Sequence, residues 1–153
     1  RSGSSFGVSR VAAPEHLAAA AEEAFRHDRE ILLEEAVPGF EVSCAILGST
    51  ALTVGAVAEF QVEGGFIDYG EKYADPEKTA EIQETAKRIY RCLDCRVFAR
   101  VDLFLTPWGE LVFNEVNTIP GCTPHSCYPG MMQAIGLDFQ TLVSRLVELG
   151  VEA

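Results

Sequence analysis

Four polar side chains interrupt two apolar, strand-like runs of the chain, and their types suit a metal and phosphate site. They are Arg100, Asp102, Glu115 and Asn117. A Pro-Trp-Gly turn at 107–109 lies between the runs and predicts a β-hairpin. Because side chains alternate along a strand, each pair shares one face of its own strand. If the two faces coincide, three hard oxygen ligands for magnesium meet beside an arginine suited to phosphate. The alternative is a solvent-facing hairpin edge.

The elements that must position this hairpin predict an α+β fold in one domain, residues 1–153. Strands are expected at 8–12, 31–33, 40–47 and 51–60, besides the two hairpin runs. Helices are expected at 15–27, from Pro76 onward with Asp75 as N-cap, and from about Asp138 onward. Loops are expected at 1–7, 61–74 and 118–129.

Helical spacing also predicts which residues of the later helices face a core. In the middle helix these are Ile82, Ala86, Ile89, Tyr90 and Leu93. In the last helix they are Phe139, Leu142, Val143, Leu146 and Val147. Because helices and antiparallel strands interleave along the chain, the expected class is α+β.

Two loops carry residues suited to an anionic ligand. The small residues of 3–7, Ser4 among them, can aim amides and hydroxyls at a phosphate, or they form a plain terminal loop. In a later loop, Lys72 supplies a positive charge, and Tyr69 and Tyr73 supply phenolic donors. That composition suits closure over an anionic substrate. A solvated charged loop is the alternative.

Two further segments could complete a nucleotide and substrate site. Residues 34–37 could bind a nucleobase through backbone groups, and the Glu41 carboxylate could bind a ribose; otherwise they are an acidic strand end. After the hairpin, Gly121 can present a backbone N–H to an oxyanion, and Ser126 can present a hydroxyl to a carboxylate.

Composition narrows the partners. The formal net charge of −11 argues against nucleic acid or an anionic membrane as the main partner. No apolar run approaches about 20 residues, so no transmembrane span is expected. The five cysteines are an odd number, which favours a reducing cytoplasm over a disulfide scaffold. A zinc set of Cys92, Cys95, Cys122 and Cys127 is a weaker interpretation, because only the first two are tightly spaced.

Taken together, these motifs resemble the D-alanine–D-alanine ligase family of the ATP-grasp superfamily, including its D-Ala–D-Ser and D-Ala–D-lactate relatives in vancomycin resistance. The matching segments cover nearly the whole chain in the family's order: 1–7, 34–41, 68–73, 99–102 and 114–121. The resemblance implies the C-terminal portion of an ATP-grasp fold, an antiparallel sheet with flanking helices. It also implies that an N-terminal substrate domain and an upstream ATP-binding strand lie outside this sequence.

The resemblance assigns the nucleotide and metal ligands residue by residue. The adenine-binding stretch matches Glu34, Ala36 and Val37, and the ribose ligand matches Glu41. The ligands of two magnesium ions match Asp102, Glu115 and Asn117, with Glu115 bridging. ATP and magnesium are therefore the implied cofactors.

The same resemblance assigns residues around the reacting groups. Ser4 and Tyr73 match a substrate-positioning network, Lys72 matches the lysine on the transferred phosphate, and Arg100 matches the arginine that stabilises the phosphoryl group. Gly121 and Ser126 match the groups that hold the tetrahedral carbon's oxygen and the second substrate's carboxylate. Tyr69 belongs to the loop expected to exclude water, and Cys127 lines the second-substrate pocket.

The implied reaction joins D-alanine to a second D-amino acid, D-alanine or D-serine, through a D-alanyl phosphate during synthesis of peptidoglycan precursors. A homodimer is the family expectation for the full-length protein, and the fragment alone is expected to be inactive. Cys127 departs from the Met, Leu or Arg usual in the family, which leaves the second substrate open. Another ATP-grasp carboxylate–amine ligase and a non-catalytic nucleotide- or metal-binding module are the alternatives.

Overall fold

The computed structural model describes residues 5–60, 67–69 and 75–152. The chain divides into two compact units, residues 1–36 and 37–153. In the first unit a short 3₁₀ helix, η1 (Pro14–His16), leads into helix α1 (Leu17–Phe25), as the sequence predicts. Pro14 suits this start because its fixed φ and missing N–H are tolerated in a first helical turn.

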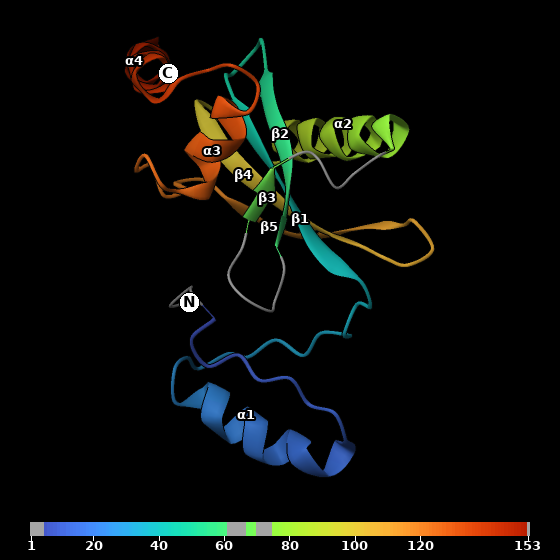
Figure 1. The fold of residues 1–153 in the computed structure, drawn as a ribbon. Helices are drawn as coiled ribbons and strands as arrows, with labels where there is room; N and C mark the ends of the chain where they lie inside the picture. The colour runs from blue at the N-terminus through green and yellow to red at the C-terminus, as the bar shows by residue number, and fades with distance from the viewer. Residues whose placement is uncertain (1–4, 61–66, 70–74, 153) are drawn as a thin grey trace. The chain divides into compact units, whose positions relative to one another are not determined.

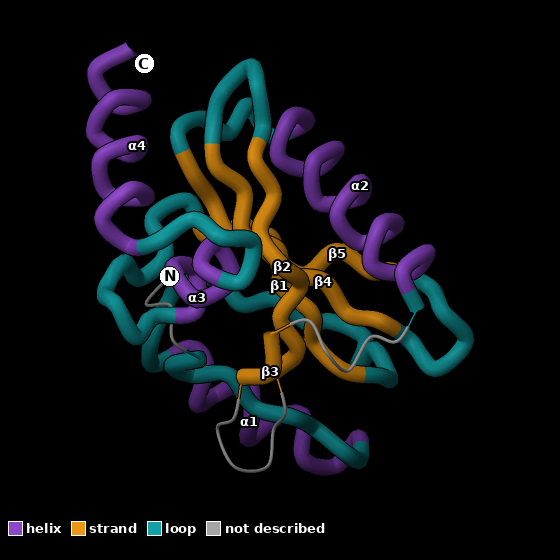
Figure 2. Tube along the Cα trace, turned by 45° about the horizontal axis from the view of Figure 1, so that its top comes forward, coloured by secondary structure: helices purple, strands orange, loops and turns teal. Residues whose placement is uncertain are grey.

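The second unit contains a five-stranded antiparallel sheet in the order β3-β2-β1-β4-β5. The strands are β1 (Phe40–Leu47), β2 (Thr53–Phe60), β3 (Ile67–Tyr69), β4 (Phe98–Leu105) and β5 (Leu111–Asn117). The helices are α2 (Pro76–Cys92), α3 (Cys127–Gln133) and α4 (Phe139–Glu152). Figure 1 shows α2 on one face of the sheet and α3 with α4 on the other, and the rotated tube in Figure 2 shows the same separation.

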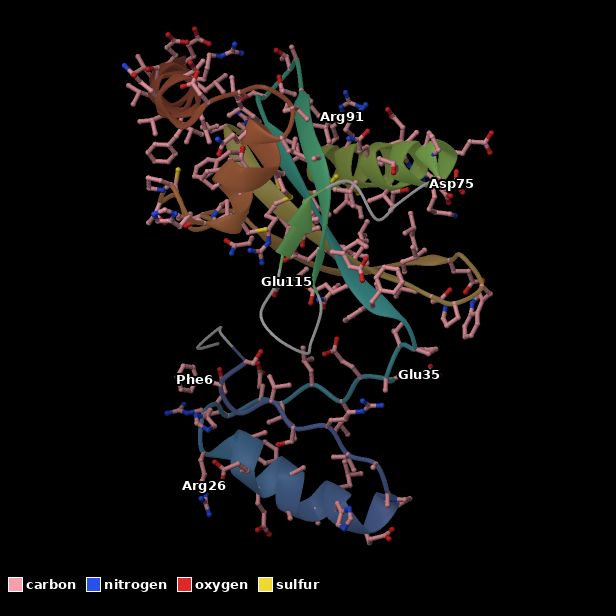
Figure 3. The ribbon with its side chains drawn as sticks, viewed as in Figure 1. Phe6, Arg26, Glu35, Asp75, Arg91 and Glu115 are labelled. Carbon is pink, nitrogen blue, oxygen red and sulfur yellow. The ribbon has the colours of Figure 1, made fainter. Side chains whose placement is uncertain are left out.

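Helix α2 covers one face of the sheet with the apolar stripe that its spacing predicts. Ile82, Ala86 and Tyr90 are fully buried against alternate residues of β1 and β4. Asp75, labelled at the start of α2 in Figure 3, accepts hydrogen bonds from the backbone N–H of Glu77 (2.9 Å) and Lys78 (3.3 Å). The predicted N-cap is therefore confirmed.

The opposite face is apolar at one end of its strands. Ala45 and Leu47 of β1 pack with Ala58 of β2 beneath α3, and Leu142 of α4 completes this cluster. The Tyr128 hydroxyl of α3 donates to the Ile46 carbonyl at 2.9 Å, which satisfies a polar group inside the cluster. The helices α3 and α4 thus cover only part of this face.

Gly39 permits the entry into β1 that places the polar end of this face. Its φ is +128°, and a Cβ added there would lie 2.1 Å from the Leu105 carbonyl oxygen. A side chain at this position would collide with the neighbouring strand β4. Glu41 and Ser43 follow directly on β1.

Two predicted strands are wrong. Residues 8–12 form no strand, because turns at Ser5 and Gly7 with positive φ angles precede them and the Val8 N–H bonds the Ser5 carbonyl. Residues 31–33 pair with no strand among the described residues, and the Leu32 and Leu33 side chains are exposed. Apolar composition alone makes no strand without a partner for its hydrogen bonds.

Other differences are smaller. The predicted strand 51–60 begins at Thr53, the predicted loop 61–74 contains β3, and the predicted loop 118–129 contains the start of α3. Leu93 is mostly exposed beyond the end of α2, and Val143 and Val147 are exposed on α4. Leu142 is the buried residue of α4, and it packs in the cluster with Ala45 and Leu47 of β1. Among the described residues, no helix combines the length and apolar character needed to cross a membrane.

Candidate functional site

The register of β4 and β5 places the four predicted residues on one face. Asp102 lies opposite Glu115, and Arg100 lies opposite Asn117. Asp102 also lies opposite Ser43 of β1, and Arg100 lies opposite Ala45. Because Ala45 packs beneath α3, the four residues share the face that α3 partly covers. Glu115 is labelled on the sheet in Figure 3.

A β-bulge in β5 sets which side chains reach this face. The pairing passes from Asp102–Glu115 to Leu103–Phe113, so Asn114 is the extra residue. Leu103, the partner of Phe113, belongs to the core under α2. Phe113 therefore lies on the α2 face of the sheet and Glu115 on the opposite face, although residues two apart on a regular strand would share a face. The bulge lets one short strand serve both the apolar core and the polar site.

The Asp102 carboxylate is the most enclosed charge of the site. Its side chain is 0% exposed, while that of Arg100 is 20% exposed. Arg100 Nε donates to Oδ1 at 2.8 Å and to Oδ2 at 3.1 Å, and Nη2 donates to Oδ2 at 2.8 Å. Ser43 Oγ donates to Oδ1 at 2.5 Å. A forked arginine and a hydroxyl together compensate a carboxylate that water does not reach.

Glu41 and Cys127 interact electrostatically with the Arg100–Asp102 pair. The hydrogen bond to Asp102 raises the pKa of Arg100 above its ordinary value, and the charges of Cys127 and Glu41 add to that rise. Partial burial raises the pKa of Glu41, and the nearby carboxylates of Asp102 and Glu115 raise it further while Arg100 opposes them. Glu41 thus belongs to the same acidic face as the predicted metal ligands.

The segment after β5 brings the predicted substrate residues to the start of α3. Ser126 Oγ accepts the Thr123 N–H at 3.0 Å and lies 2.8 Å from Thr123 Oγ1. A Cβ on Gly121 would lie 3.2 Å from Ser126 Oγ, so the glycine allows the close approach of these two residues. Cys127 follows as the first residue of α3, near Arg100.

The remaining predicted residues lie elsewhere. Ser4, Lys72 and Tyr73 are outside the described residues. Tyr69 is described through its backbone, which pairs with Ala58 in the row that also contains Ser43, Asp102 and Glu115. Glu34 and Ala36 are exposed in the first unit, and Val37 begins the second.

Sequence reasoning missed Ser43. Its signal was available, because a lone serine between Val42 and Cys44 interrupts an apolar strand and falls on the same face as Glu41 by alternation. The cysteines offer no zinc site within the described ranges: all five thiols are free, and no three Cys, His, Asp or Glu side chains there form a metal-type group.

Asp102, Glu115 and Asn117 fit the kind of magnesium site in which the protein supplies only a few of the ligands. Magnesium takes one or two carboxylates and completes its octahedron with phosphate oxygens and water. Asp102 and Glu115 supply two carboxylates across one strand pair. The Asn117 Oδ1 accepts the Ile119 N–H at 3.1 Å and retains a second lone pair. Because Asp102 is enclosed, a cation would replace one arm of the Arg100 fork.

A sheet flanked by helices, with carboxylates and an arginine on its partly covered face, agrees with the C-terminal portion of an ATP-grasp fold, and the comparisons with known proteins establish this class. The family model described as "D-ala D-ala ligase C-terminus" matches residues 1–148, and the chain belongs to this family. The predicted fold class, α+β of the ATP-grasp type, is confirmed by the solved structures that it resembles.

Particular relatives support the same conclusion. The chain is 44% identical to the vancomycin/teicoplanin A-type resistance protein VanA of Enterococcus faecium, over 99% of this chain and 49% of the relative. The VanG D-Ala:D-Ser ligase of Enterococcus faecalis matches with a TM-score of 0.86 and 50% identity, over 96% of this chain and 46% of that one. The D-alanine–D-alanine ligase of Coxiella burnetii matches with a TM-score of 0.91 and 33% identity, over 98% and 42%. The chain thus spans about half the length of these proteins.

Replacing Arg100 tests whether the ion pair compensates a buried charge. Arg100→Leu leaves the Asp102 carboxylate without its main partner, so the free energy of unfolding should fall by about 3–5 kcal/mol in denaturant titration. Arg96→Leu is the matched control, because Arg96 and Asp94 have the same spacing but side chains 60% and 86% exposed. That variant should lose at most about 1 kcal/mol. Equal losses in the two variants would contradict the burial argument.

The raised pKa of Glu41 predicts a pH dependence of stability. A carboxyl group whose folded pKa lies above its unfolded value stabilises the fold below the unfolded pKa, near 4.5, and this contribution is lost as pH rises through the folded pKa. Glu41→Gln removes the titration. The stability of the variant relative to the parent chain should therefore increase from pH 4 to pH 7 in parallel denaturant titrations. A relative stability that stays constant or decreases over this range would refute the assignment.

Proposed function

We propose that this chain supplies the metal- and phosphate-binding portion of an ATP-dependent ligase that joins D-alanine to a second D-amino acid for peptidoglycan precursors. The observation that carries the proposal is the face that unites Arg100, Asp102, Glu115 and Asn117 by strand register. The family match and the ligase relatives support it.

The chemistry of these residues suits transfer of a phosphoryl group to a carboxylate. Phosphoryl transfer spreads negative charge over several oxygens, so it depends on positive groups held in place rather than on protein nucleophiles. Arg100 provides such a group, and Lys72 is proposed to provide another. The γ-phosphoryl of ATP goes to the D-alanine carboxylate and gives a D-alanyl phosphate. The amine of the second D-amino acid then attacks the acyl carbon, and inorganic phosphate leaves.

Asp102, Glu115 and Asn117 would hold the magnesium ions, which when bound neutralise charge on the phosphates. The residues of this chain have complementary tasks. Arg100 lies beside the Asp102 carboxylate, so the same face would offer a cation site and an arginine for phosphate. Glu41, half-buried on the same face, is proposed as the ribose ligand. The segment 34–37 is proposed to bind the adenine, and Ser4 and Tyr73 are proposed to position the first D-alanine.

The second substrate is proposed to lie near Gly121, Ser126 and Cys127. Ser126 and Gly121 are in close approach, and Cys127 lies near Arg100. The VanG structure is titled a D-Ala:D-Ser ligase and that of Coxiella burnetii a D-alanine–D-alanine ligase. We propose D-alanine or D-serine as the second substrate, a cytoplasmic location, and a homodimer for the complete protein.

Phosphate release by the complete protein that contains this sequence tests the proposal. Release from ATP should require magnesium and D-alanine, and adding D-serine should show whether it is the preferred second substrate. Asp102→Asn should lower the rate by more than about 100-fold, the scale of losing one electrostatic group at a transition state. Asp94→Asn, an exposed site away from this face, should leave the rate unchanged. No release with D-alanine, D-serine or D-lactate would refute the ligase proposal, and near-normal turnover of Asp102→Asn would refute the metal assignment.

A further inference from the structure

Ser43 is a polar side chain fully enclosed in the middle of β1. It is 0% exposed, and within the described residues its only companions as buried polar side chains are Asp102 and Thr106. Thr106 is accounted for by the β4–β5 turn, where its Oγ1 accepts the Glu110 N–H at 2.9 Å. Enclosing a hydroxyl is unfavourable unless it is hydrogen-bonded. The Ser43 hydroxyl meets this requirement through its hydrogen bond to Asp102, its partner in the sheet register.

The hydrogen bonds divide the two oxygens of Asp102 unequally. Oδ1 accepts from Ser43 Oγ at 2.5 Å and from Arg100 Nε at 2.8 Å. Among the residues that the structure describes, Oδ2 accepts from Arg100 alone, through Nη2 at 2.8 Å and Nε at 3.1 Å. If Arg100 shifts, Oδ2 loses its contacts, whereas Oδ1 keeps the bond to Ser43. The serine thus fixes one oxygen independently of the arginine.

We propose that Ser43 is a positioning residue that anchors Asp102 through Oδ1, so that Oδ2 can be exchanged between Arg100 and a divalent cation. This inference rests on the proposed function. Without the anchor, the carboxylate would rotate with the departing guanidinium. With the anchor in place, Arg100 can turn toward a phosphate while Asp102 stays in position. The Oδ2 atom that Arg100 leaves is then available to a cation. Ser43 itself touches neither the cation nor a substrate.

Partners that orient a metal ligand typically contribute about 10- to 100-fold to metal affinity. Ser43→Ala removes the donor and should weaken cation binding by at least about 10-fold. Ser43→Thr keeps a hydroxyl and should stay within about 3-fold of the parent affinity, although the extra methyl group in an enclosed position reduces stability. Ser43→Thr should therefore lose stability while it keeps its metal affinity, so the two quantities can be separated.

Cys44 offers a matched control for stability alone. It is the next residue of β1 and is also 0% exposed, but it faces the core under α2. Cys44→Ala leaves a small void and should lower the free energy of unfolding while leaving cation affinity unchanged. A loss of affinity that merely follows a loosened sheet would appear in both Ser43→Ala and Cys44→Ala.

The experiment measures Mn²⁺ binding to the complete protein with a saturating non-hydrolysable ATP analogue, by electron paramagnetic resonance of the free ion. We expect the Kd for Mn²⁺ to rise at least about 10-fold in Ser43→Ala and to stay near the parent value in Ser43→Thr and Cys44→Ala. If Ser43→Ala does not fold, Ser43→Cys replaces it, because a thiol is only a weak donor.

An unchanged Kd in Ser43→Ala, or an equal rise in Cys44→Ala, would overturn the role of Ser43 while the parent protein still binds Mn²⁺. Failure of the parent protein to bind Mn²⁺ with the analogue would instead overturn the proposed function, and the role of Ser43 with it. Parallel denaturant titrations of each variant separate stability from affinity.

Discussion

The buried carboxylate of Asp102 is the constraint around which the polar face is arranged. An ionised group enclosed in a sheet costs several kcal/mol unless charge and hydrogen bonds compensate it. The sheet meets this requirement from two directions: Arg100 lies two residues earlier on β4, and Ser43 lies opposite on β1. The register is strongly specified, because a one-residue shift of β4 would turn Arg100 and Asp102 to the apolar face of the sheet.

The same constraint explains why one face of β1 is polar at one end and apolar at the other. Along one face of β1, Glu41 and Ser43 are followed by Ala45 and Leu47. The helices α3 and α4 pack on the apolar end, and the acidic end lies beyond the cluster that they form. The other face is apolar throughout, with Val42, Cys44 and Ile46 beneath α2. An apolar core on one side therefore supports a charged site on the other without sharing residues with it.

Much of this could be predicted from sequence. Period-two alternation and a turn signal located the β4–β5 hairpin, and the stripe through Ile82 and Tyr90 located the face of α2. The bulge at Asn114 could not be predicted, because it depends on how β5 pairs with β4. The Ser43–Asp102 bond was missed for the same reason: 59 residues separate its partners, and only the fold shows that they are neighbours. Apolar composition predicts a strand at residues 31–33, whereas a strand also requires a partner for its hydrogen bonds.

We propose that this face holds a divalent cation between Asp102 and Glu115, next to an Arg100 that binds phosphate. A crystal structure of the complete protein with magnesium and a non-hydrolysable ATP analogue tests it most directly. We expect a cation in contact with both carboxylates, with Ser43 still bonded to Asp102 and at least one arm of Arg100 turned from Asp102 to the phosphates. A cation bound away from both carboxylates, with the Arg100 fork unchanged on Asp102, would contradict it.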